Sequence, residues 1–112
     1  MTGRDVLGEL ELAVMAAIIR LRRDAYGMRI RSFIQEQTGR RTPIGSIYVT
    51  LDRLKEKGYI SSFLGDPTAE RGGRAKQFYI IEAPGAAVFN RSREHVLALL
   101  TDIGTVVGGA HG

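Results

Sequence analysis

Basic side chains stand on both sides of one short segment that is predicted to be helical. Arg40 and Arg41 precede this segment, residues 42–58, and a later loop carries three more cations, Arg71, Arg74 and Lys76. Cations in two loops that flank one helix are suited to neutralising phosphates on both sides of a DNA groove, and phosphate contacts supply most non-specific affinity for DNA. The alternative interpretation is a set of solvated surface charges.

The later loop also contains the pair Gly72 and Gly73. Two glycines at its tip would let the loop approach the minor groove without a side-chain clash. A nucleotide-binding loop needs a glycine-rich turn that leads from a strand into a helix, whereas this loop lies between two predicted strands. We therefore predict that the loop contacts DNA rather than a nucleotide.

The flanked segment places a distinctive set of side chains on its outward face. On a helical wheel, Ile47 and Leu51 mark the buried stripe, and Val49 then points most directly outward. An exposed valine can contact a thymine methyl group, and a glycine lets the backbone come close to base edges. Glu56 and Asp52 also point outward, and Thr50 lies on a flank of this face. The residues of this segment that we predict to bind DNA are Thr42, Gly45, Ser46, Tyr48, Val49 and Arg53.

The titratable residues give little support for a catalytic site. There is no cysteine, which excludes disulfides, thiolate metal sites and a cysteine nucleophile. Of the two histidines, His95 has Glu94 beside it in a predicted helix, where adjacent residues do not face each other, and His111 lies in a glycine-rich tail. We predict no enzyme, no metal site and no cofactor. The aromatic residues are interpreted as core rather than as a cofactor site: Tyr26, Phe33, Tyr59, Phe63, Phe78 and Tyr79.

Length and charge limit the class of protein. The chain has 112 residues, which allows one compact domain, and a core of this size benefits from a partner subunit. Its net charge of +4 equals the excess of basic over acidic residues within residues 40–80, which contain eight basic and four acidic residues. The longest apolar run, Leu12 to Ile19, is too short to span a bilayer, and Asp5 stands where a signal peptide would be basic. We expect a cytoplasmic protein with no membrane partner.

The positions of these residues depend on a predicted order of helices and strands. Apolar spacing predicts helices over about 7–21, 26–38, 42–58 and from about Pro84 onward, and strands over 59–64 and 77–81. Gly39 and Gly58 end the second and third helices, while Thr42 caps the third and Pro43 takes its first position. This order predicts an α+β fold, mainly α: a winged helix-turn-helix with a C-terminal dimerisation helix. The expected divisions are 1–82 for the DNA-binding domain, 83–104 for the dimerisation helix and 105–112 for a flexible tail.

A family resemblance rests on an ordered set of short motifs over roughly residues 7–85. They include Tyr26-Gly27, the helix start Gly45-Ser46-Ile47-Tyr48, and a loop from Pro67 through Gly73-Arg74 followed by Tyr79. Together they resemble the PadR family of bacterial transcriptional regulators. The resemblance implies a homodimeric repressor that responds to small phenolic or drug-like molecules. The sequence departs from the family where Glu82-Ala83-Pro84-Gly85 replaces the threonine that usually caps the last helix.

The first and last predicted helices carry more apolar surface than one small core requires. Exposed apolar stripes of this size usually mark an interface, and a symmetric homodimer would cover both. A small apolar or aromatic effector would fit where these helices of two subunits meet. The rival interpretation is a winged-helix protein-interaction module without specific DNA binding. The residues predicted to form the dimer interface are Leu10, Val14, Phe89, Val96, Leu99, Leu100 and Ile103.

Overall fold

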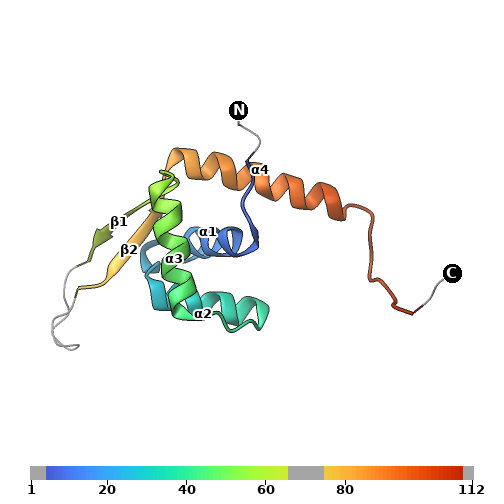
Figure 1. Cartoon of the computed structure of the whole chain (residues 1–112), viewed down its shortest axis with the longest axis horizontal. Coiled ribbons are helices and arrows are strands. Elements are labelled where there is room, and N and C mark those ends of the chain that lie inside the picture. The colour runs from blue at the N-terminus through green and yellow to red at the C-terminus, as the bar shows by residue number, and fades with distance from the viewer. Residues whose placement is uncertain (1–4, 66–74, 110–112) are drawn as a thin grey trace.

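A computed structural model describes residues 5–65 and 75–109 of the chain. Three helices form a compact body, and a two-stranded hairpin and the far end of a fourth helix project to opposite sides of it (Figure 1). This arrangement confirms the predicted α+β, mainly helical, winged helix-turn-helix fold. Within the described ranges no helix is long and apolar enough to cross a membrane. The elements are α1 (Glu9–Leu21), a 3-10 turn η1 (Arg22–Asp24), α2 (Gly27–Thr38), α3 (Ile44–Glu56), β1 (Ile60–Leu64), β2 (Gln77–Ile81) and α4 (Ala83–Leu100).

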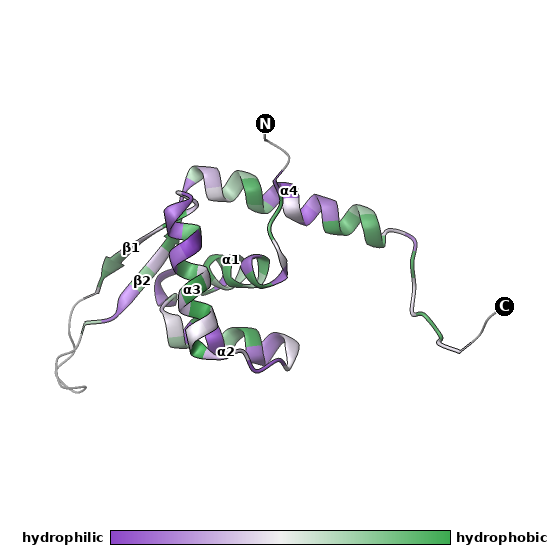
Figure 2. Cartoon of the chain, in the orientation of Figure 1, coloured by the Kyte–Doolittle hydropathy of each residue, from purple (hydrophilic) through white to green (hydrophobic). Residues whose placement is uncertain are grey.

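The core forms where the apolar stripes of α1, α2 and α3 meet. Met15, Ile30 and Leu51, one from each helix, have no exposed surface. Figure 2 shows that hydrophobic residues are concentrated in α1 and appear again at the far end of α4. Val14 is also fully buried in this core. Its predicted place in a dimer interface is therefore wrong, because it has no surface left for a second copy.

The helix ends follow local chemistry at two glycines. Gly39 and Gly58 both adopt left-handed backbone conformations, with φ of 78° and 79°. Glycine adopts this conformation without a Cβ clash, so it is favoured where a helix must stop and the chain must turn. Both predicted helix ends are confirmed. At the start of α1, the Glu11 carboxylate accepts a hydrogen bond from the Gly8 N–H at 2.9 Å, which pairs a donor that the helix leaves free.

The two strands form an antiparallel hairpin that is joined to the turn between α1 and α2. Ile60 pairs with Ile81 and Leu64 with Gln77, so the first strand starts one residue later than predicted. The Tyr79 N–H donates to the Ala25 carbonyl at 2.9 Å and fixes β2 against that turn. Of the six aromatic residues predicted as core, only Tyr79 is buried, and Phe63 is 46% exposed. Phe33 and Tyr59 pack partly against the core. The far part of the hairpin extends past the helices, so Phe63 and Phe78 stack on each other there.

The first half of α4 is anchored to the body of the same chain. The Ser92 hydroxyl accepts a hydrogen bond from the Leu7 N–H and donates one to the Val88 carbonyl, each at 2.7 Å. A Cβ on Gly85 would overlap the backbone of Tyr59, so this glycine permits the close approach. The helix starts at Ala83, with Glu82 at its N-cap position. It ends at Leu100 rather than near residue 104, which places Ile103 outside the helix.

Candidate nucleic-acid interface

The segment between α2 and α3 is held by one arginine of α2. Arg31 donates through Nε to the Thr42 carbonyl at 2.7 Å, and the Thr38 hydroxyl accepts from the Arg40 N–H at 3.1 Å. These bonds fix the entry to α3 relative to α2. Arg31 could not be singled out from the sequence, because a solvated arginine would have the same position in the helical pattern. A buried carbonyl partner is visible only in three dimensions.

Thr42 has a different role from the one predicted. The helix starts at Ile44 with Pro43 at its N-cap position, and no side chain forms a capping hydrogen bond there. Thr42 is buried, at 7% exposure, so its side chain is not presented to a DNA surface. The predicted cap and the predicted first helical position of Pro43 are both corrected. Thr42 belongs to the packing that supports α3.

The outward face of α3 is open near its N-terminus. Val49 is 56% exposed and Tyr48 is 41% exposed. Gly45 and Arg53 are exposed as well, Ser46 is half-buried, and Thr50 is buried rather than on a flank. A Cβ on Gly45 would have no neighbouring atom within 4 Å among the described residues, so these residues do not require glycine there. Because the lack of a side chain at Gly45 serves no contact among them, it is consistent with the close approach of a binding partner.

Charge divides the exposed face of α3 into two halves. The charged residues of α3 are all exposed and lie towards the C-terminal end of the helix, where two cations stand among two carboxylates: Asp52, Arg53, Lys55 and Glu56. Gly45, Ser46 and Val49 form an uncharged surface at the other end. Recognition helices contact base edges mainly through their N-terminal residues. The exposed part of α3 that carries no charge is thus its N-terminal half, the half that recognition helices use to contact bases.

Two contacts hold α3 in place under this face. The Tyr48 hydroxyl packs against Gly27 at the start of α2, and a Cβ at that glycine would overlap it. Tyr79 of β2 is buried, with its hydroxyl near Tyr48 and Asp52 of α3. Burial raises the pKa of the Tyr79 hydroxyl, and Tyr48 and Asp52 nearby raise it further. Tyr79 is thus neutral at physiological pH and adds no charge beneath the interface.

The predicted cations do not share one environment. Arg40 forms an exposed ion pair with Glu9 at 2.9 Å, which is worth little in water and can be exchanged for a phosphate. Arg41 is exposed, and within the described residues it makes no ion pair. Lys76 lies over the Tyr26 ring, with Nζ 4.2 Å from the ring centre. The other predicted contacts of the later loop, Arg71, Gly72, Gly73 and Arg74, lie outside the described residues.

An aromatic row lies on the hairpin of β1 and β2, in the strand residues close to the loop that joins them. Phe63 stacks on Phe78 with the ring centres 5.7 Å apart, and Tyr26 meets Phe78 edge to face at 5.6 Å. Lys76 covers the end of this row. Because Tyr26 immediately precedes α2, the row connects the hairpin to the helix-turn-helix. The two strands and α3 thus belong to the same body.

A second exposed surface lies on the outer half of α4. Val96, Leu99 and Leu100 are 37%, 64% and 58% exposed, and Leu97, which the sequence analysis did not name, is 50% exposed. Ile103, just beyond the helix, is also exposed. Leu10 and Phe89 instead pack partly against the core of their own chain. Of the predicted dimer residues, four are therefore exposed and free to contact a second copy: Val96, Leu99, Leu100 and Ile103.

The described residues contain no arrangement suited to a metal ion. No group of three or more histidine, cysteine, aspartate or glutamate residues comes together in them. His95 is exposed on α4. Among the described residues, the surface suited to DNA is therefore the α3 face, with Arg41 before the helix and Lys76 immediately before β2.

Comparison with known families decides the class of protein. A model of the transcriptional regulator PadR-like family matches residues 14–91. The chain belongs to the PadR-like family. Its members are transcriptional regulators, which confirms the family predicted from sequence and the prediction that the chain is not an enzyme. No curated protein matches closely enough to be counted as a relative.

Solved structures of transcriptional regulators, two of them PadR or PadR-like, share the fold. A PadR-like regulator from Bacillus cereus strain ATCC 14579 is 20% identical, with a TM-score of 0.71 over 90% of this chain and 93% of that one. Bacillus subtilis PadR in complex with operator DNA is 18% identical, with a TM-score of 0.56 over 92% of this chain and 54% of that one. A putative regulator from Thermoplasma acidophilum is 22% identical, with a TM-score of 0.62 over 85% and 93%.

Proposed function

We propose that this transcriptional regulator binds an operator in double-stranded DNA as a homodimer and represses transcription from it. The observation that carries the proposal is the uncovered, uncharged N-terminal half of α3, where Val49 is 56% exposed. A valine this exposed on a helix that is otherwise anchored by its buried side suits contact with base edges. The structural similarity to Bacillus subtilis PadR in complex with operator DNA supports the same use of the fold.

The proposed dimer uses the outer half of α4. Five apolar side chains are exposed on that half or just beyond it, namely Val96, Leu97, Leu99, Leu100 and Ile103. The inner half is already anchored to its own chain. Two-fold symmetry would place the two α3 helices about 34 Å apart, or a multiple of it, so we expect the operator to be an inverted repeat. A small apolar or aromatic effector then releases the protein by changing the separation of the two helices.

The dependence of DNA affinity on salt tests this function against the protein-interaction alternative. The wild type is expected to lose affinity steeply as salt rises, because bound cations of the protein release counterions from DNA. Arg41→Ala should weaken specific and random duplexes alike and reduce the slope of log K against log salt by about 0.9, the value of one phosphate contact. Fluorescence anisotropy with labelled duplexes measures both quantities.

A matched control is Arg93→Ala, which removes the same charge from an exposed position of α4. Its slope should equal that of the wild type. If the slope of Arg41→Ala equals the wild-type value, Arg41 in the loop before α3 does not contact DNA. No measurable affinity of the wild type for any duplex would favour the protein-interaction module.

A further inference from the structure

The connection between α2 and α3 is held by side chains rather than by backbone hydrogen bonds. In the described residues, the backbone of residues 40–42 forms no hydrogen bond to another backbone group. It bonds instead to two side chains of α2, because the Arg40 N–H donates to the Thr38 hydroxyl and the Thr42 carbonyl accepts from Arg31. The placement of α3 relative to α2 therefore depends on these two side chains.

The Arg31 guanidinium uses only part of its bonding capacity on this carbonyl. Its Nε donates to Thr42 at 2.7 Å, whereas a guanidinium has five N–H donors. Within the described ranges Arg31 forms no ion pair, and its two terminal amino groups donate to no other described group. No polar side-chain atom of these ranges is buried without a hydrogen-bond partner, so the terminal amino groups reach solvent. Arg31 thus brings an uncompensated positive charge to the turn before α3.

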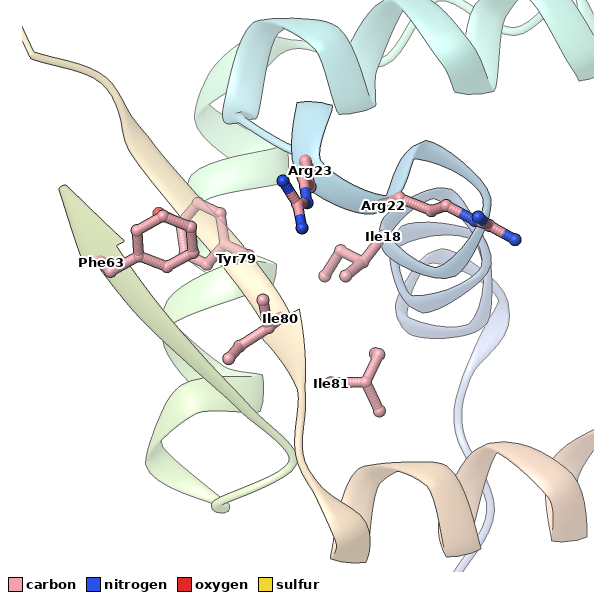
Figure 3. Close-up of a pocket in the computed structure, with 7 residues that line it drawn as sticks. All are labelled: Ile18, Arg22, Arg23, Phe63, Tyr79, Ile80 and Ile81. Carbon is pink, nitrogen blue, oxygen red and sulfur yellow. The ribbon is translucent and has the colours of Figure 1, made fainter. Parts of the chain in front are cut away.

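Figure 3 shows two arginines that are not held in this way. Arg22 and Arg23 of η1 lie at the rim of a cavity of about 260 Å³ whose lining includes Ile80 and Ile81 of β2. The Arg22 guanidinium extends away from the cavity, and neither arginine donates a side-chain hydrogen bond to another described residue. Such side chains lose rotamer freedom when they bind an anion. Arg31 has already lost much of this freedom, so it is pre-organised for an anion.

The position of Arg31 in the fold indicates which anion this is. In a helix-turn-helix the first helix crosses the DNA backbone while the second lies in the major groove. Arg31 belongs to the first of these helices, α2, and its guanidinium lies at the entry to the second, α3. The exposed Arg41 is the neighbour of Thr42 in the same turn. Two cations thus stand where the DNA backbone would pass.

We propose that Arg31 binds one DNA phosphate beside α3 through its terminal amino groups while its Nε holds the Thr42 carbonyl. Arginine suits this double role because its planar group presents several donors at fixed angles, whereas lysine carries one compact ammonium group. The bound phosphate is thereby linked to the position of α3, so a duplex with its backbone correctly placed is read best. This inference rests on the proposed DNA-binding function and adds a contact that was not predicted from the sequence.

A chemical double-mutant cycle tests the contact with the full chain. Single phosphates of the duplex that the wild type selects from random DNA are replaced by neutral methylphosphonates, and fluorescence anisotropy measures the affinity of the wild type and Arg31→Gln. At one position beside each α3, the replacement should weaken the wild type about tenfold or more and Arg31→Gln less than about twofold. Arg31→Gln should also reduce the slope of log K against log salt by about 0.9.

Arg31→Lys separates the positioning of α3 from the charge. Lysine keeps the charge, but its ammonium group cannot reach the carbonyl and the phosphate in the same fixed geometry. The salt slope should stay at the wild-type value, whereas the preference for the selected duplex over random DNA should fall about tenfold. Arg29→Lys is the matched control on the same helix, because Arg29 pairs with Asp24 and Glu36. This variant should keep both the slope and the preference.

Two results would contradict the phosphate contact: an Arg31→Gln slope equal to that of the wild type, and no phosphate whose replacement affects the two proteins differently. An Arg31→Lys variant with wild-type preference would contradict the positioning role. If a variant fails to fold, nitrogen NMR of the wild-type guanidinium groups decides, because only a phosphate contact shifts the Nη signals of Arg31 when duplex is added. Unchanged Nη signals would overturn the proposal. A wild type that binds no duplex would overturn the DNA-binding function as well.

Discussion

Val49→Glu is expected to lower affinity for the operator by more than about a hundredfold, while folding and dimerisation are unchanged. The side chain is 56% exposed on α3, so the substitution does not disturb the core. A carboxylate at this position would be brought against a polyanion and desolvated there, and like charges placed together at an interface cost several kcal/mol. Fluorescence anisotropy with an operator duplex measures the loss, and sedimentation checks the dimer.

Val107→Glu provides the control for Val49→Glu, because it makes the same change of charge at a residue that is 77% exposed beyond the end of α4. Its affinity should stay within a small factor of the wild-type value, as only long-range and screened charge is added. Equal losses in both variants would show a general effect of net charge. If Val49→Glu binds the operator with wild-type affinity, the outward face of α3 does not contact DNA.

Leu99→Glu should convert the dimer to a monomer that binds the operator about 10²- to 10⁴-fold more weakly. Leu99 is 64% exposed on the outer half of α4, and a carboxylate buried against a second copy would have no partner to offset its desolvation. The affinity falls because two linked half-sites gain from their effective concentration, and a monomer loses this gain. Analytical sedimentation and anisotropy on the same samples provide the two measurements.

Asn90→Glu is the matched control for Leu99→Glu. Asn90 is exposed on the inner half of α4 and lies about 180° around the helix from Leu99 at 100° per residue. It should remain dimeric and bind as the wild type does. A monomeric wild type at micromolar concentration would contradict the proposed dimer, and so would a Leu99→Glu variant that stays dimeric.

Local chemistry was sufficient to predict the order of helices and strands. Gly39 and Gly58 end helices for a reason contained in a single residue, the cost of a Cβ in the left-handed region. The start of α3 could not be obtained in this way, because both Thr42 and Pro43 suit a helix start by type. The choice between them depends on Arg31, which binds the Thr42 carbonyl from another helix.

Which apolar residues lie in the core and which lie at an interface could not be predicted from the sequence. Both Val14 and Leu99 belong to apolar stripes, yet the first is fully buried and the second is 64% exposed. The difference arises because the inner half of α4 and the segment before α1 are joined through Ser92 and cover their own chain. Likewise, a turn rich in arginine gave no sign that Arg23 lies beside a cavity, since β2, which forms its wall, is more than fifty residues away along the chain.

Selection of bound fragments from a pool of random duplex DNA tests the central claim most directly. The central claim is that two copies of the chain, joined through α4, read one operator with two α3 helices. The expected result is enrichment of an inverted repeat whose half-sites are about one helical turn, or a multiple of it, apart. In the same selection, Val49→Glu should enrich nothing. Enrichment of a single half-site, or recovery of no preferred sequence by the wild type, would contradict the claim.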